Sequence, residues 1–170
     1  MAKPSEGEAV LRVDKPGLLT TVQDLGRPGH RKFGVPPSGA MDRFALAAAN
    51  RLVGNSENAA GLECALNGPV LLALQPCLVA VTGADFTPSV NGVEVPLWTG
   101  VYLAAGERLS FAARKWGARC YIAVAGGLGG SRWLGSLATY LLVEKGGFDG
   151  RTLEAGDVLS LAAPAPRPLI

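Results

Sequence analysis

A chain of 170 residues is long enough to bury a hydrophobic core without help from a metal ion or a disulfide bond. Its 16 basic and 14 acidic side chains nearly balance, and no run of Lys or Arg could follow a phosphate backbone, so the composition excludes a nucleic-acid-binding role. No stretch approaches the roughly 18 apolar residues that cross a bilayer, and the acidic N-terminus lacks an export signal. We therefore expect no membrane partner.

The three cysteines, Cys64, Cys77 and Cys120, are odd in number, widely spaced and surrounded by apolar residues. This pattern predicts buried free thiols rather than a disulfide framework. Free thiols are typical of a reducing compartment, so the predicted location is the cytoplasm.

The chain divides into a flexible N-terminus at residues 1–8, one domain at residues 9–162 and a Pro-rich linker or tail at residues 163–170. Within the domain, glycine and proline recur at short intervals between apolar runs, which predicts a mainly β fold made of short strands. The predicted strands are Ala9–Val13, Leu18–Val22, Leu62–Leu66, Val70–Leu74, Leu78–Thr82, Thr87–Val90, Val93–Val95, Gly100–Leu103, Arg108–Ala112, Cys120–Ala125 and Val158–Leu161.

One segment, Met41–Val53, departs from the strand pattern and predicts the principal α-helix. Its stripe of apolar residues at helical spacing consists of Met41, Ala45, Ala48 and Leu52. Ser38 or Asp42 could cap the first amide groups of this helix, and Gly54 would end it in a left-handed conformation.

Two connections between strands are specified by their own residues. Asn91-Gly92 favours positive φ at both central positions and predicts a type I′ hairpin. Asn67-Gly68-Pro69 predicts a turn between two apolar runs. Local hairpins should therefore dominate the pairing.

The segment from Thr20 to Asp42 concentrates glycine, proline and polar side chains, and we expect it to be an ordered loop. Two interpretations of its polar residues stay open. In the first, Asp24 pairs with Arg27, Gln23 satisfies loop backbone groups, and Asp42 favours the start of the helix. In the second, Gln23, Arg27 and Asp42 line a cleft for a carboxylate, carbamate or amide substrate.

Motifs for several common chemistries are missing from the sequence. The single histidine, His30, excludes a His-containing triad with a spare ligand histidine, and it has no cysteine at metal-ligand spacing, so no metal site is expected. The sequence has neither G-x-x-x-x-G-K-[ST] nor G-x-S-x-G, and the run 126–130 fits no phosphate loop. We expect this chain to bind no cofactor by itself.

Short motifs follow one another in order along most of the chain. They are T-V-Q-D-x-G-R-x-G from Thr21, G-V-P-x-S-G-A-M-D from Gly34, T-G-A-D from Thr82, A-T-Y-L from Ala138 and G-F-x-G-R from Gly147. The series resembles the biotin-dependent carboxyltransferase family, which includes the C-type component of 5-oxoprolinase, allophanate hydrolase subunit 2-like proteins and a domain of urea carboxylase. The resemblance extends from Val10 to Leu161.

The resemblance implies a cyclophilin-like β-barrel with one principal helix at about 41–53, as the first half of a longer protein. It also implies partners: a B-type companion protein and, in 5-oxoprolinase, an A-type companion protein. Together these proteins couple ATP hydrolysis to the opening of 5-oxoproline to glutamate, and this half alone is expected to be inactive.

Two alternatives from the same family stay open. In a urea carboxylase or allophanate hydrolase-type system, the related domain takes carboxylate from carboxybiotin and passes it to urea. ATP or carboxybiotin is therefore expected only in the complete complex. In another branch, a regulatory binding module antagonises a histidine-kinase inhibitor.

The polar loop and the family motifs together lead to a hypothesis about substrate binding, without assigning a catalytic base. The candidate residues are Gln23, Asp24, Arg27, Ser38, Asp42, Asp85 and Thr139. They would orient a small acyl or amide substrate and polarise its carbonyl. For Asp85, a role in capping a local turn stays equally open. Family members commonly carry Arg after a Gly-Ser pair, where this chain has Leu137, so an anion site there is expected to be lost or moved.

Overall fold

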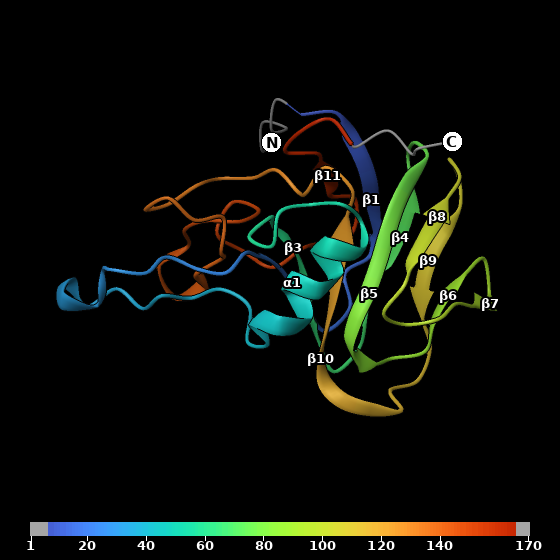
Figure 1. The fold of residues 1–170 in the computed structure, drawn as a ribbon, viewed down its shortest axis with the longest axis horizontal. Helices are drawn as coiled ribbons and strands as arrows, with labels where there is room; N and C mark the ends of the chain where they lie inside the picture. The colour runs from blue at the N-terminus through green and yellow to red at the C-terminus, as the bar shows by residue number, and fades with distance from the viewer. Residues whose placement is uncertain (1–6, 166–170) are drawn as a thin grey trace.

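Two antiparallel sheets make up the fold, which the computed structural model describes over residues 7–165 (Figure 1). The six-stranded sheet has the order β11 (Val158–Ser160), β1 (Ala9–Lys15), β4 (Val70–Ala73), β9 (Arg108–Phe111), β6 (Pro88–Val90) and β7 (Val93–Glu94). The five-stranded sheet has the order β2 (Leu19–Gln23), β3 (Gly61–Ala65), β10 (Trp116–Val124), β5 (Cys77–Asp85) and β8 (Gly100–Leu103). The mainly β class and every predicted strand are confirmed; the bounds of Gly100–Leu103 agree, and the other strands have shifted ends.

The two sheets share one core but do not join into a closed barrel. Leu11 and Leu71 from the six-stranded sheet lie in the same buried cluster as Leu62 and Ile122 from the five-stranded sheet. Within residues 7–165, no backbone ladder connects an edge strand of one sheet to an edge strand of the other. The edge strands β7 and β11 have only two and three residues, so burial of apolar side chains rather than edge pairing holds the sheets together. The expected barrel is therefore open.

The predicted helix is present as α1 (Arg43–Leu52). Asp42 caps it, because its Oδ1 accepts a hydrogen bond from the backbone N–H of Ala45 at 2.9 Å. Gly54 follows the C-terminal end with a φ of 79°, as predicted. Ser38, the other candidate cap, instead accepts a hydrogen bond from an arginine of the preceding loop.

The buried face of α1 differs from the predicted stripe. Met41 and Leu52 belong to that stripe, yet they are 73% and 38% exposed. The buried residues of the helix are Ala45, Leu46, Ala49 and Asn50. Ala49 packs in one cluster with Ala80 of β5 and Ala123 of β10, so small side chains bring the helix close to the outer face of the five-stranded sheet. The fit between helix and sheet, not side-chain bulk alone, sets the rotation of the helix.

The predicted type I′ hairpin joins β6 to β7. Asn91 and Gly92 have φ values of 49° and 86°, and Val90 pairs with Val93 across the turn. Both central residues therefore adopt the left-handed conformation that this turn requires.

The ends of the described chain are tied to the body of the domain. The backbone N–H of Leu161 donates to the carbonyl of Glu8 at 2.9 Å, and that of Ala163 donates to the carbonyl of Gly126 at 3.1 Å. Most of the predicted flexible ends, residues 1–6 and 166–170, lies outside the described residues. In the part of the chain that is described, α1 is too short to cross a membrane, and no other helix is long and apolar enough to do so.

The three cysteines are buried free thiols, as predicted. Cys64 of β3 and Cys120 of β10 face each other directly across the two strands. The hydrogen bond between these thiols and their burial hold the pKa of Cys120 well above its usual range. Burial alone raises the pKa of Cys77 to about 11 from an ordinary value of 9.0.

Cys77 should make the stability of the domain depend on alkaline pH. Because its pKa is higher in the folded state, the folded state keeps a proton that the unfolded state releases, so this contribution is complete below pH 9 and is lost as pH rises toward 11. The expected loss is on the order of 2 kcal/mol. Urea unfolding of Cys77→Ala between pH 8 and pH 11 should show a shallower decline than the parent chain. Val79→Ala on the same strand should lower stability but keep the parent slope, and equal slopes for all three proteins would contradict the assignment.

Candidate functional site

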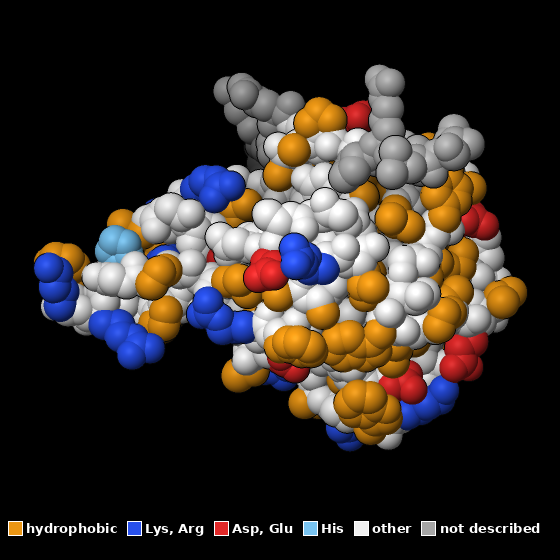
Figure 2. All heavy atoms as spheres, in the orientation of Figure 1, with side chains coloured by type: hydrophobic (Ala, Val, Ile, Leu, Met, Phe, Trp, Pro, Cys, Tyr) orange, Lys and Arg blue, Asp and Glu red, His pale blue; other side chains and the backbone are white. Residues whose placement is uncertain are grey.

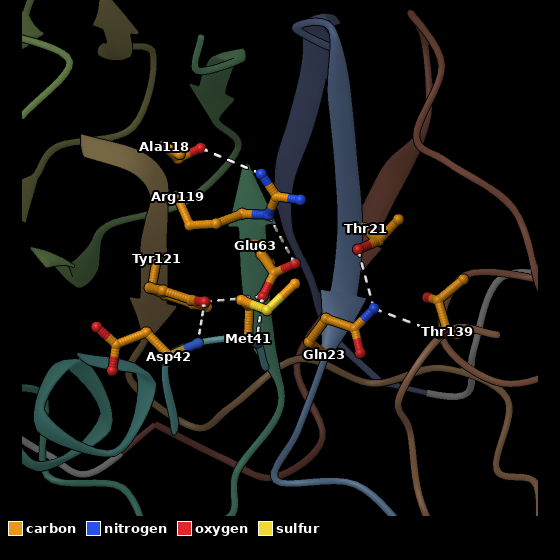
Figure 3. Close-up of polar contacts among 9 residues, drawn as sticks. All are labelled: Thr21, Gln23, Met41, Asp42, Glu63, Ala118, Arg119, Tyr121 and Thr139. Atoms are coloured by element: carbon orange, nitrogen blue, oxygen red, sulfur yellow. Dashed lines mark hydrogen bonds and ion pairs between the residues drawn. The ribbon is translucent and has the colours of Figure 1, made fainter. Parts of the chain in front are cut away.

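Polar side chains gather on the outer face of the five-stranded sheet (Figure 3). Thr21 of β2 pairs with Glu63 of β3, which pairs with Tyr121 of β10, so the three side chains point to the same face. Gln23 and Arg119 lie two positions along their strands and share this face. These five residues are called the polar platform below. The intervening residues point to the opposite, buried side.

Two segments project from the sheet beside the platform (Figure 1). The first, residues 25–40, is called the arm and leads from β2 to α1. The second, residues 129–150, is called the second loop and follows β10. Helix α1 covers the β5 and β10 part of the outer face through Ala49, so the platform lies where both projecting segments begin.

Tyr121 and Glu63 anchor the end of the arm. The Tyr121 hydroxyl donates to Glu63 Oε2 at 2.8 Å and accepts a hydrogen bond from the backbone N–H of Asp42 at 2.7 Å. The same Glu63 oxygen accepts a hydrogen bond from the backbone N–H of Met41 at 2.8 Å, and Arg119 Nε lies 3.4 Å from Oε1 (Figure 3). Burial raises the pKa of Tyr121 far above its usual value, so the hydroxyl stays protonated at neutral pH and keeps both bonds.

Asp24 ties the arm to the second loop. Its Oδ1 accepts hydrogen bonds from the backbone N–H of Gly26 and from Ser136 Oγ, and its Oδ2 accepts one from the backbone N–H of Leu137, each at 2.7 Å. Leu137, where the family commonly has Arg, is buried in the core cluster. Asp24 is therefore a buried carboxylate whose charge is satisfied by neutral donors.

Arg27 makes the second tie between the arm and the second loop. Its side chain is 1% exposed, and its Nη1 donates to Ser38 Oγ at 2.8 Å. Its Nη2 donates to the carbonyl of Ala138, and its guanidinium carbon lies 4.9 Å from the centre of the Trp133 ring. Burial lowers the pKa of Arg27, and the nearby charge of Asp24 opposes that effect. Among residues 7–165 no carboxylate lies within ion-pair distance of Arg27, so the direct pair with Asp24 considered above does not form.

Gln23 and Thr139 connect β2 to the second loop. Gln23 Nε2 donates to Thr21 Oγ1 at 3.0 Å and to the carbonyl of Thr139 at 3.3 Å, while Thr139 Oγ1 donates to the carbonyl of Val22 at 2.8 Å. Because a carbonyl only accepts, it fixes which end of the Gln23 amide points to Thr139. Gln23 Oε1 is buried and has no hydrogen-bond partner among the described residues, so it is a free acceptor on the platform.

The structure separates Asp85 from the other predicted site residues. Asp85 pairs with Trp116 at the first end of β10, whereas Gln23 lies at the far end of the sheet, beside Gly61 of β3. Its Oδ1 accepts a hydrogen bond from the backbone N–H of Thr87 at 2.7 Å, and Lys115 Nζ lies 3.9 Å from Oδ2. Asp85 therefore caps a local turn and is not part of the polar platform.

A hollow of about 490 Å³ opens inside the second loop. It carries charges of both signs, and its charged and aromatic lining comprises Arg132, Trp133, Glu144, Lys145 and Asp149. Trp133 stacks on Tyr140 with ring centroids 6.2 Å apart, and Arg27 lies over the same Trp133 ring. The hollow is therefore connected to the arm through Trp133 and Arg27.

The sequence interpretation did not include Glu63, Arg119 or Tyr121 among the candidate site residues. The available signal was one acidic residue inside the apolar strand candidate Leu62–Leu66 and two polar residues at the start of the Cys120–Ala125 candidate. Only the pairing register brings these positions onto one face, and hydrophobic pattern alone does not determine which strands are neighbours. Among residues 7–165, no group of three or more His, Cys, Asp and Glu side chains could hold a metal ion.

Comparison with known proteins finds related chains. Residues 33–169 match the family model described as carboxyltransferase domain, subdomain A and B. The chain is 39% identical over 153 residues to the urea amidolyase of Lachancea kluyveri, covering 89% of this chain and 8% of that protein. It is 40% identical over 154 residues to the C-type component of 5-oxoprolinase from Escherichia coli K12, covering 89% of this chain and 49% of that protein.

A solved structure has the same fold over nearly the whole chain. The crystal structure of the K. lactis urea amidolyase matches with a TM-score of 0.89 at 35% identity, covering 98% of this chain and 10% of that one. The chain thus spans about half the length of the 5-oxoprolinase relative and a small part of the urea amidolyases.

The contacts of Arg27 lead to a stability prediction. Arg27→Lys should lower the free energy of unfolding by about 2 kcal/mol. The planar guanidinium donates to both Ser38 Oγ and the carbonyl of Ala138, and a single ammonium group cannot make both hydrogen bonds in the same geometry. Urea unfolding measures the loss, and limited proteolysis should show faster cleavage within the arm. Arg31→Lys, at an exposed position of the arm, is the matched control and should change neither. Parent-like unfolding and cleavage of Arg27→Lys would show that this tie does not hold the arm.

Proposed function

Because this chain belongs to the family of carboxyltransferase domains with subdomains A and B, we propose that it is the C-type component of an ATP-dependent 5-oxoprolinase. The observation that carries the proposal is the 40% identity over 154 residues to the C-type component of the Escherichia coli 5-oxoprolinase. In this role it acts with a B-type and an A-type companion protein in opening 5-oxoproline to glutamate.

The geometry of the platform and of the neighbouring Asp24 supports a component that depends on partners. Asp24 accepts three hydrogen bonds, and Glu63 accepts two and lies beside Arg119, so neither carboxylate is free to take a proton from substrate. Tyr121 is held as a neutral hydroxyl between Glu63 and Asp42. None of these three groups is therefore free to act as the general base for ring opening.

The hollow in the second loop fits the chemistry of 5-oxoproline. This substrate has a carboxylate at one end and a ring amide with one N–H and one carbonyl. Arg132 and Lys145 supply cationic donors for the carboxylate, while Glu144 and Asp149 supply acceptors for the N–H. A volume of about 490 Å³ accommodates a molecule of this size.

The predicted site residues then divide into two roles. Asp24, Arg27, Ser38 and Thr139 act as positioning residues, because their polar atoms are bonded to other parts of the arm, the strand β2 and the second loop. Gln23 retains a buried acceptor oxygen without a hydrogen-bond partner among the described residues, so it is assigned to neither role. Asp42 has an exposed side chain beside the platform, although one of its oxygens caps α1.

ATP and carboxybiotin fit poorly on the platform and on the adjoining base of the arm. Both groups are anionic and need cationic donors, but Arg27 is engaged with Ser38 and Ala138, and Arg119 lies against Glu63. We place the binding of either group in the rest of the complete complex. The three reduced, buried thiols support a cytoplasmic location for that complex.

A second candidate function is carboxyl transfer in a urea carboxylase-type system. The 39% identity to urea amidolyase and the TM-score of 0.89 to a urea amidolyase structure favour it. Carboxylated urea is also a small anionic amide, so the hollow suits it for the same chemical reason. The regulatory role toward a histidine-kinase inhibitor remains an expectation that none of these relatives supports.

The proposed function predicts a measurable activity. The full-length protein, purified with its companion proteins, should release glutamate from 5-oxoproline with ATP consumption. Arg132→Ala and Lys145→Ala should each raise KM for 5-oxoproline about tenfold with a smaller change in kcat, because they remove ground-state contacts to the carboxylate. Arg114→Ala, on an exposed segment between β9 and β10, is the matched control and should leave both constants unchanged.

Three outcomes would redirect the proposal. ATP consumption that responds to urea but not to 5-oxoproline would favour the carboxyl-transfer candidate. Activity with unchanged KM in both variants would remove the hollow from the substrate site. An intact complex that consumes ATP with neither substrate would contradict both enzymatic functions.

A further inference from the structure

The arm is a self-contained projection with its own hydrogen bonds. Near its base, the backbone N–H of Arg27 donates to the carbonyl of Pro37 at 2.7 Å. At its tip, the residues Arg31–Phe33 form a single 3-10 turn, and the N–H of Phe33 donates to the carbonyl of His30 at 3.0 Å. Figure 1 shows the tip extending away from both sheets. The tip is therefore ordered without covering any part of the core.

The base of the arm is packed as tightly as glycine allows. A side-chain carbon on Gly26 would lie 2.6 Å from the carbonyl oxygen of Pro37, and one on Gly39 would lie 2.6 Å from the nitrogen of Gly26. Both glycines also have positive φ values, 92° and 87°. Together with the ties through Asp24 and Arg27, this packing fixes the direction of the arm. A surface held in place before binding loses less conformational entropy when a partner docks.

The tip presents an exposed aromatic ring beside basic side chains. Phe33 is 71% exposed, and Lys32 Nζ lies 5.0 Å from the centre of its ring. Arg31 is also exposed, and His30 begins the turn. Between Asp24 and Asp42 the sequence has no acidic residue, and Figure 2 shows the basic side chains and the histidine at the end of the projection. Aromatic and Arg side chains at such positions are typical of protein interfaces.

We propose that the arm tip is a docking element that inserts Phe33 into an apolar pocket rimmed by carboxylates on the B-type companion protein. The inference rests on the proposed function, which makes this chain one component of a complex, and it adds the surface and the chemistry of contact. Because the tip has an excess of positive charge, an acidic rim on the partner would complement it. Because the direction of the arm is fixed, the tip fits a folded, preformed pocket better than one that forms on binding.

Other classes of partner fit the tip less well. A phosphate backbone needs a row of cations, whereas the tip has Arg31, Lys32 and one histidine on a chain with a net charge of only +2. A membrane surface needs an extended apolar face, whereas the tip offers one large apolar side chain, Phe33. A second copy of this chain is tested directly below.

The experiment measures affinity between the full-length protein and the purified B-type companion protein by calorimetry. Phe33→Ser should weaken binding about tenfold or more, and Phe33→Trp should largely keep it. Arg31→Glu combined with Lys32→Glu should weaken binding and flatten the dependence of Kd on salt between about 50 and 300 mM. Phe44→Ser is the matched control: Phe44 is 74% exposed on α1, outside the arm, and its loss should leave affinity unchanged.

Several results would overturn the docking role. These are no binding by the parent protein, parent-like affinity in all arm variants, or an equal loss in Phe44→Ser. If the parent protein forms dimers and the arm variants are monomers, the tip binds a second copy of this chain instead. Binding of the parent tip to single-stranded DNA or to anionic vesicles, without binding to the companion, would also contradict it. Thermal unfolding at the parent temperature confirms that each variant is folded.

Failure of this inference is distinguishable from failure of the proposed function. A complex that depends on Phe33 but consumes ATP with neither 5-oxoproline nor urea leaves the docking role in place and removes the enzymatic one. A complex that is active and binds with unchanged affinity when Phe33 is replaced leaves the enzymatic role in place and removes the docking one.

Discussion

The arrangement of the arm and the second loop depends on one buried cation. Arg27 brings a full positive charge to a site that is 1% exposed, and it is satisfied there by Ser38, the carbonyl of Ala138 and the face of Trp133. Burying a charge without these partners would cost several kcal/mol, so the guanidinium is stable only when the arm and the second loop are both in place. The two segments therefore order each other.

The same logic explains why polar family motifs behave as scaffold here. The sequence predicted Asp24, Arg27 and Thr139 as ligand-binding residues. In the structure, each side chain forms hydrogen bonds with other groups of the protein. Buried polar networks of this kind specify a single arrangement because every unmade bond is costly in a low-dielectric interior. What they specify is the position of the hollow beside Trp133 and the direction of the arm. In the two proposals above, the ligand contacts lie in the hollow and the partner contacts lie at the tip of the arm.

The sheet supplies the rigid base for this arrangement. Alternation along β2, β3 and β10 sends Val22, Leu62 and Ile122 into the core and their neighbours to the outer face. Small residues beneath α1 bring that helix close to β5 and β10, and its capping residue Asp42 is held by Tyr121. The end of the arm next to α1 is thus fixed to the sheet by the hydrogen bond from the backbone N–H of Asp42 to Tyr121. The side chains of Asp24 and Arg27 tie the other end of the arm to the second loop.

The sequence by itself determined the local elements: the strands, the helix with its Gly54 end, and the Asn91-Gly92 hairpin. It left Ser38 and Asp42 both open as the cap of the helix, and the structure decided for Asp42. These depend on side-chain alternation, capping and φ preference, which act between residues close in the chain. Only the tertiary structure decided that Glu63 and Tyr121 meet and that Asp85 lies apart from the other predicted site residues. It also decided that Arg27 lies over the Trp133 ring and that the two sheets do not close into a barrel. Those outcomes depend on strand order and register, set by packing between residues distant in sequence, which local pattern does not encode.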